Sequence, residues 1–174
     1  MRRHSSLVSH SSIVSLLVAG TAFALLGAAA SAVADPITHK CGKPVSSVLK
    51  TEFAQFTTNS TTFQNLPSST TTVDVGKGGC IKVRLFAEMR CSQTANDDVC
   101  TFRTIEPGVT ALDPPVNGVA FIGEGGPAGF STHSFAWVKE FGPGKHKIAV
   151  QAGVQNAATT MEVQSWTLEI EVTK

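Results

Sequence analysis

Residues 134–153 read SFAWVKEFGPGKHKIAVQAG, two halves around a Gly-Pro-Gly segment. In each half the apolar residues fall on alternate positions: Phe135, Trp137 and Phe141 first, then Ile148, Val150 and Ala152. Such alternation is typical of strands with one buried face. Pro143 presets φ for the second position of a turn, and Gly144 supplies the positive φ that a type II turn needs next. The stretch therefore predicts a β-hairpin in an all-β protein.

The strand pattern continues on both sides of this stretch. From Cys80 to Met89 the odd positions are apolar and the even positions are mostly charged, with Phe86 as the exception on the polar face. A strand with one solvent-exposed face indicates an antiparallel sheet. We count about eight or nine short strands and no helix after the N-terminal region. This count predicts an antiparallel β-sandwich, jelly-roll or immunoglobulin-like, whose strand order does not follow from the sequence.

Two segments are less regular. Residues 46–58 carry both helical and strand spacing, and we assign a strand from about Thr51. The last strand, residues 161–173, changes phase, because its apolar residues are first odd and then even: Met161 and Val163, then Trp166, Leu168, Ile170 and Val172. A one-residue shift in a period of two would send half of the strand to the wrong face. The pattern therefore predicts a β-bulge or kink near Gln164-Ser165.

The N-terminus has the organisation of a secretory signal peptide. A basic start with Arg2 and Arg3 precedes an alanine-rich apolar run, and an Ala-x-Ala pattern ends at Ala34. Such a segment is removed from the mature protein. We expect cleavage after Ala34, with Ala32 as the competing site and a transmembrane anchor as the alternative function of the run. Residues 35–174 then form a single domain that is secreted or periplasmic. The alanine-rich signal is typical of bacteria.

The four cysteines all lie in the expected mature part of the chain. An even number of cysteines in an exported protein predicts two disulfides. Three pairings are open, and we favour Cys91–Cys100, which closes a polar loop, with Cys41–Cys80, which ties the N-terminal segment to a strand. A zinc site is disfavoured because no Cys-x-x-Cys occurs.

Charge and hydropathy limit the partners. The expected mature chain has 12 basic and 13 acidic residues, a net charge of −1. A near-neutral chain argues against nucleic acid or an anionic membrane surface, which need a basic patch. After the signal no apolar run is long enough to span a bilayer.

Catalytic signals are weak. The mature histidines stand far apart in the sequence, no Gly-x-Ser-x-Gly occurs, and Ser131 and Ser134 beside His133 do not make a triad by proximity alone. Asn96-Asp97-Asp98 fits a turn better than a calcium site. We expect no metal, no cofactor and no catalysis. The alternative is a small secreted hydrolase or metalloenzyme that uses His133 or His146 with a nearby carboxylate such as Glu140.

The function that we favour from the sequence is that of a non-catalytic binding or structural module. Trp137 and Trp166 share the phase of apolar neighbours, which predicts core positions, whereas Phe86 is the candidate for an exposed ring. Loops at residues 92–98, 106–117 and 124–129 are further contact candidates. We expect a protein or glycan partner, or self-association into an oligomer. The chain resembles small exported bacterial β-sandwich proteins in this architecture and in the Ser-Phe-x-Trp and Pro-Gly-x-His segments.

Overall fold

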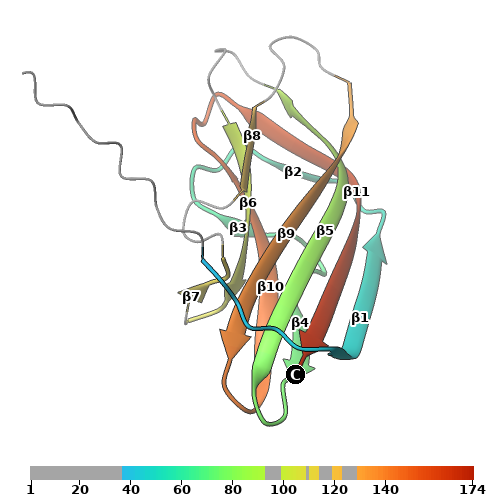
Figure 1. Cartoon of the computed structure of the whole chain (residues 1–174). Coiled ribbons are helices and arrows are strands. Elements are labelled where there is room, and N and C mark those ends of the chain that lie inside the picture. Colours follow the sequence, from blue (N-terminus) through green and yellow to red (C-terminus); the bar gives the residue numbers. More distant parts are fainter. Residues whose placement is uncertain (1–36, 93–98, 109, 114–118, 123–128) are drawn as a thin grey trace, which may run out of the picture. The chain divides into compact units, whose positions relative to one another are not determined.

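The fold is all-β. The computed structural model describes residues 37–92, 99–108, 110–113, 119–122 and 129–174; the expected signal peptide lies outside them. These residues form eleven strands and no helix, and nine of the strands are longer than two residues. Every pairing is antiparallel, and the strands make two sheets (Figure 1). An all-β fold of antiparallel sheets is thus confirmed, and the strand number agrees with the expected eight or nine.

The five-stranded sheet has the order β1-β11-β5-β9, with β2 pairing β11 beyond the end of β1. Its strands are β1 (Pro44–Glu52), β2 (Phe56–Thr58), β5 (Gly79–Ser92), β9 (Ser131–Phe141) and β11 (Thr160–Thr173). The two 14-residue strands, β5 and β11, lie side by side in its centre.

The six-stranded sheet has the order β3-β10-β6-β7, with β4 also pairing β10 and β8 also pairing β6. Its strands are β3 (Gln64–Asn65), β4 (Thr71–Asp74), β6 (Val99–Glu106), β7 (Thr110–Ala111), β8 (Val119–Ile122) and β10 (Lys145–Val154).

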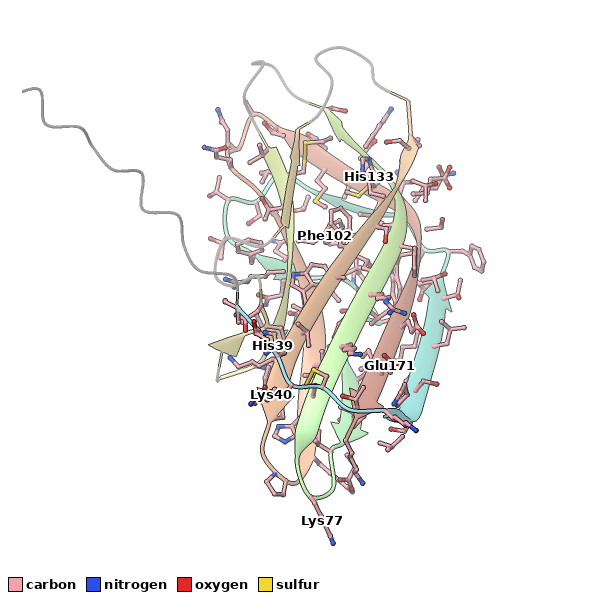
Figure 2. All side chains as sticks on the ribbon, in the orientation of Figure 1. His39, Lys40, Lys77, Phe102, His133 and Glu171 are labelled. Carbon is pink, nitrogen blue, oxygen red and sulfur yellow. A yellow bond between two sulfur atoms is a disulfide. The ribbon has the colours of Figure 1, made fainter. Side chains whose placement is uncertain are left out.

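One hydrophobic core receives side chains from both sheets. Alternate residues of β5 and β11 point into it, as the sequence pattern predicts. Phe102 of β6 and Phe135 of β9 meet there with ring centroids 5.1 Å apart, and Phe102 lies between the sheets in Figure 2. Trp137 and Trp166 are each 2% exposed, so the prediction that both tryptophans belong to the core is confirmed. Burying one such large apolar side chain contributes about 1.5–3 kcal/mol.

The predicted hairpin is wrong. Its two strands form as β9 and β10, but β9 pairs with β5 in one sheet and β10 pairs with β4, β3 and β6 in the other. The turn at Gly144, whose φ is 122°, therefore carries the chain from sheet to sheet. Two consecutive strands with one apolar face each can bury those faces side by side or across a core, and alternation alone does not separate the two arrangements.

The predicted bulge is confirmed. Val163 pairs with Met89 and Ser165 pairs with Glu88, so Gln164 is the extra residue of β11. Met161 and Val163 before it, and Trp166 and Leu168 after it, are all buried. The expected start of the strand at Thr51 is wrong, because β1 begins at Pro44. The reason is its position at a sheet edge, where weak burial leaves little alternation to detect.

Residues 37–43 form a strap across the outer face of the five-stranded sheet, and Figure 1 shows it running in front of β9 and β5 into β1. The backbone N–H of Lys40 donates to Glu140 Oε1 of β9, and that of Lys174 donates to the carbonyl of Lys43. Cys41 forms a disulfide with Cys80 of β5. Cys91 and Cys100 form the second disulfide. These are the two pairs that the sequence favoured.

Candidate functional site

A groove of about 230 Å³ lies on the outer face of the five-stranded sheet. Two exposed rings border it, Phe53 at 79% and Phe86 at 42% exposure. The other outward side chains are polar, and with the two rings they define what we name the aromatic groove: Thr51, Glu88, Thr132, Ser165 and Thr167. Phe86 therefore holds the exposed position that the sequence predicted for it.

The strand register places these side chains in two rows. Thr51 of β1 pairs with Thr167 of β11, which pairs with Phe86 of β5. The hydroxyls of Thr51 and Thr167 lie 3.3 Å apart and share a hydrogen bond. Because all three residues are on one face, the ring of Phe86 and the hydroxyls form a continuous surface.

The second row depends on the bulge. Gln164 takes up one extra position, so Ser165 faces outward opposite Glu88, which pairs in turn with Thr132 of β9. Ser165 Oγ donates to Glu88 Oε2 at 3.4 Å. Bulges commonly re-aim a side chain beside a functional site. Here the bulge directs the hydroxyl of Ser165 towards the carboxylate of Glu88 while Trp166 stays in the core.

Glu52 fixes the backbone at Phe53. Its Oε1 accepts the backbone N–H of Ala54 at 3.1 Å and that of Phe53 at 3.0 Å. The hydrogen bond from Ala54, then that from Phe53, hold the pKa of the Glu52 carboxyl below its ordinary value, because both stabilise the ionised form. The turn after β1 is thereby held by a charged carboxylate next to one wall of the groove.

Charges on the same face are neutralised in pairs between β5 and β11. Arg84 Nη1 lies 3.1 Å from Glu169 Oε2, and Lys82 Nζ lies 3.8 Å from Glu171 Oε2. At the other end Arg90 hydrogen-bonds Glu162, which raises the pKa of the guanidinium. The groove lies between these pairs along β5, and Glu88 belongs to none of the ion pairs found in the described part of the chain.

A larger cleft of about 600 Å³ opens beside the strap. His39, Asp113, Lys82 and Arg84 line it, and each of them is in an ion pair. His39 Nε2 lies 3.2 Å from Asp113 Oδ2, an ion-pair distance, but this buried nitrogen has no hydrogen-bond partner among the described residues. His39 of the strap faces Asp113, which bridges to Val138 of β9, while Lys82 and Arg84 are paired with glutamates of β11.

His146 lies beside a carboxylate, that of Glu106 rather than Glu140. His146 Nδ1 lies 2.9 Å from Glu106 Oε1, and its Nε2 lies 3.0 Å from the carbonyl of Gly142. His146 also packs on Phe141 with centroids 4.7 Å apart. Both ring nitrogens thus have partners in the fold, and neither partner is Glu140.

His133 lies near the start of β9 (Figure 2), where its Nε2 is 2.7 Å from Ser131 Oγ. Phe141, the neighbour of His146, is eight residues further along the same strand. At about 3.3 Å per residue this places Phe141, on which His146 packs, roughly 26 Å from His133 along the strand. Glu140 instead accepts the backbone N–H of Lys40.

Other predicted contact regions are only partly described. Residues 93–98, with Asn96-Asp97-Asp98, residues 114–117 and residues 124–128 lie outside the described residues. Phe53 was missed by sequence reasoning, because it stands in the segment with mixed helical and strand spacing and could not be given a face. The only available signal was its odd position, shared with Thr51.

Within the described residues, no three histidine, cysteine or acidic side chains gather as they would around a metal ion. No helix that is long and apolar enough to cross a bilayer occurs among them either. The chain matches no model of a known protein family. A search of curated proteins finds no significant similarity.

Proposed function

We propose that this protein is a secreted jelly-roll β-sandwich that binds a ligand without catalysing a reaction. Support for the jelly roll comes from the path of the chain between the two sheets. The chain changes sheet from β4 to β5, from β5 to β6, and at every step from β8 to β11. In an immunoglobulin-like fold more of the consecutive strands would pair within one sheet, whereas two interleaved Greek keys produce this alternation.

Secretion is supported by two independent features. Two disulfides indicate an oxidising, extracytoplasmic compartment. The segment ending at Ala34 has the charge and small-residue pattern of a cleaved signal. Cleavage there is tested by the intact mass of the exported protein. We expect a chain that begins at Asp35, with a mass four hydrogen atoms below that of the fully reduced form.

One observation carries the binding function: two large apolar rings, Phe53 and Phe86, are exposed on either side of a groove with a polar floor. Exposed apolar surface rimmed by polar groups is characteristic of an interaction site. The groove is built on long central strands, so its floor is preorganised and costs little to order on binding.

The enzyme alternative receives less support. It names His133 or His146 with a nearby carboxylate such as Glu140. Glu140 accepts the backbone N–H of Lys40, and His146 is held instead between the carboxylate of Glu106 and the carbonyl of Gly142. We therefore expect His133→Asn and His146→Asn variants to keep all ligand binding. A hydrolytic activity lost in either variant would restore the enzyme interpretation.

The binding function is tested by a ligand-observed NMR screen against a mixed library of small fragments, short peptides and saccharides. Phe86→Ala and Phe53→Ala should weaken the hits that wild type gives. Leu49→Ala is the matched control, because Leu49 is 70% exposed on the same face and does not line the groove. Hits that persist unchanged in both phenylalanine variants would overturn the groove as the site.

Self-association is a second candidate, favoured by the free edge of β1. Among the described strands none pairs with the outer edge of β1, whereas the β9 edge is bridged by Asp113 through two hydrogen bonds with Val138. Val45 and Leu49 are also exposed on β1. An open, partly apolar edge can pair with a second copy. Sedimentation velocity tests this directly: a monomer at all concentrations excludes it, and a dimer that Leu49→Lys dissociates supports it.

A further inference from the structure

We infer that the ligand of the aromatic groove is a neutral, linear saccharide that lies across strands β5, β11 and β1, with one sugar ring on Phe86 and another on Phe53. This inference rests on the proposed binding function. It adds the chemical class of the ligand, its minimum length and its direction on the sheet.

The strand positions of Phe86 and Phe53 set the expected length of the ligand. Phe86 on β5 is in register with Thr167 on β11 and Thr51 on β1. Neighbouring strands lie about 4.8 Å apart, so β1 is roughly 10 Å from β5. Phe53 follows Thr51 by two residues at the end of β1. A ligand that places one ring over each of these two positions is therefore elongated across the strands.

The lining chemistry fits a sugar. A pyranose with equatorial hydroxyls presents C–H groups on its faces and hydroxyls around its rim. Its face can pack on an aromatic ring, which combines a large apolar surface with a negative π-face. The hydroxyls of Thr51, Thr167 and Ser165 both donate and accept hydrogen bonds. Glu88, which already accepts from Ser165, can accept from a further hydroxyl.

A peptide fits this position less well. Peptides that bind to sheets usually add a strand to a free edge and use its backbone groups. The centre of the groove lies over β5 and β11, which have a paired neighbour on both sides. Their backbone groups are already engaged, so only side chains are available to a ligand here.

The distribution of charged side chains around the groove favours a neutral ligand. The cations that β5 presents on this face, Lys82, Arg84 and Arg90, are each paired with a glutamate of β11. Glu88 is the one acidic side chain among the groove residues. An anionic ligand would meet its repulsion without an uncommitted cation among the groove residues to offset it. The arrangement therefore disfavours nucleic acid and acidic polysaccharides.

The test is a titration with two β-1,4-linked series, glucose up to cellohexaose and N-acetylglucosamine up to chitohexaose, followed by calorimetry. Affinity should rise by about tenfold or more between the monosaccharide and the length that reaches both rings. Phe53→Ala should remove that rise and leave monosaccharide binding unchanged. Phe86→Ala should weaken binding at every length, and Leu49→Ala should match wild type.

The outcomes separate the two proposals. If neither series binds while a peptide or fragment binds in a manner sensitive to Phe86→Ala, the saccharide inference fails and the binding function stands. Saccharide binding that does not depend on chain length, or that survives Phe53→Ala with its length dependence intact, also overturns the inference. If all binding is insensitive to both phenylalanine variants, the binding function at this groove fails as well.

Discussion

Cys91 of β5 and Cys100 of β6 form a disulfide that joins the two sheets across the core. Both residues are almost completely buried, at 2% and 0% exposure. They are only nine residues apart in the sequence, and the segment between them carries the chain from the five-stranded to the six-stranded sheet. The Cys41–Cys80 disulfide has a different structural role, because it attaches the strap to the outer face of one sheet. One disulfide therefore acts between the sheets and the other on a surface segment.

Removing the inter-sheet disulfide should destabilise the fold. For the Cys91→Ala/Cys100→Ala variant, the loop-closure entropy restored to the unfolded chain lowers the free energy of unfolding by about 2.6 kcal/mol. Loss of two buried sulfur atoms adds to this cost. Urea denaturation of the variant and wild type measures the difference. The Cys41→Ala/Cys80→Ala variant is the comparison, with about 4 kcal/mol expected from its longer loop. A loss well under 1 kcal/mol in the first variant would contradict the assigned role.

Deletion of Gln164 should be tolerated. The residue is the extra member of the bulge, so its removal leaves Val163 facing the core and Ser165 facing outward in regular pairing. We expect a folded protein that loses no more than about 2 kcal/mol of stability.

Deletion of Glu169 is the matched control. It would turn Ile170 and Val172, both buried, towards solvent, at about 1.5–3 kcal/mol for each side chain. That cost is comparable with the total stability of a small domain, so this variant should not fold. Circular dichroism and thermal unfolding compare the two deletions, and equal damage from both would show that Gln164 is not a bulge.

Gly79→Ala should be strongly destabilising. Gly79 has φ 155°, and a Cβ added there would lie 2.0 Å from the carbonyl oxygen of Thr173 in β11. Backbone strain of this kind costs about 1–3 kcal/mol, and the clash adds to it because the obstacle is backbone. Gly142→Ala is the control, since no atom lies within 4 Å of its added Cβ. A thermal shift assay should show a large loss for the first variant and little change for the second.

Acid should weaken the turn that holds Phe53. The folded-state pKa of Glu52 is depressed by the hydrogen bonds from Ala54 and Phe53. A group with a depressed pKa contributes stability that is present above its unfolded pKa and is lost as pH falls through the folded value. The effect therefore lies below the ordinary glutamate pKa of about 4.3. NMR titration of the Glu52 carboxyl should show the low midpoint, and Glu52→Gln should abolish the change in the Phe53 amide shift over that range. A midpoint at or above the ordinary value would contradict the assignment.

Local features were predictable from the sequence wherever burial on one face is strong. The alternation of β5, the core positions of Trp137 and Trp166 and the exposure of Phe86 follow from period-two patterning alone. The bulge at Gln164 was equally predictable from the sequence, because one extra residue in a buried strand shifts the parity of every later apolar position. The edge strand β1 was misplaced because its residues are mostly exposed and carry almost no pattern.

The sequence by itself determined the strand class of this protein, the faces of its long strands and the break in β11, since all of these are local consequences of side-chain alternation. Only the tertiary structure decided that β9 and β10 belong to different sheets, that Glu106 rather than Glu140 pairs with His146, and that Phe53 and Phe86 line one groove. These are relations between distant segments. Alternation says which face of a strand is buried, but not which strand lies next to it or which sheet it joins.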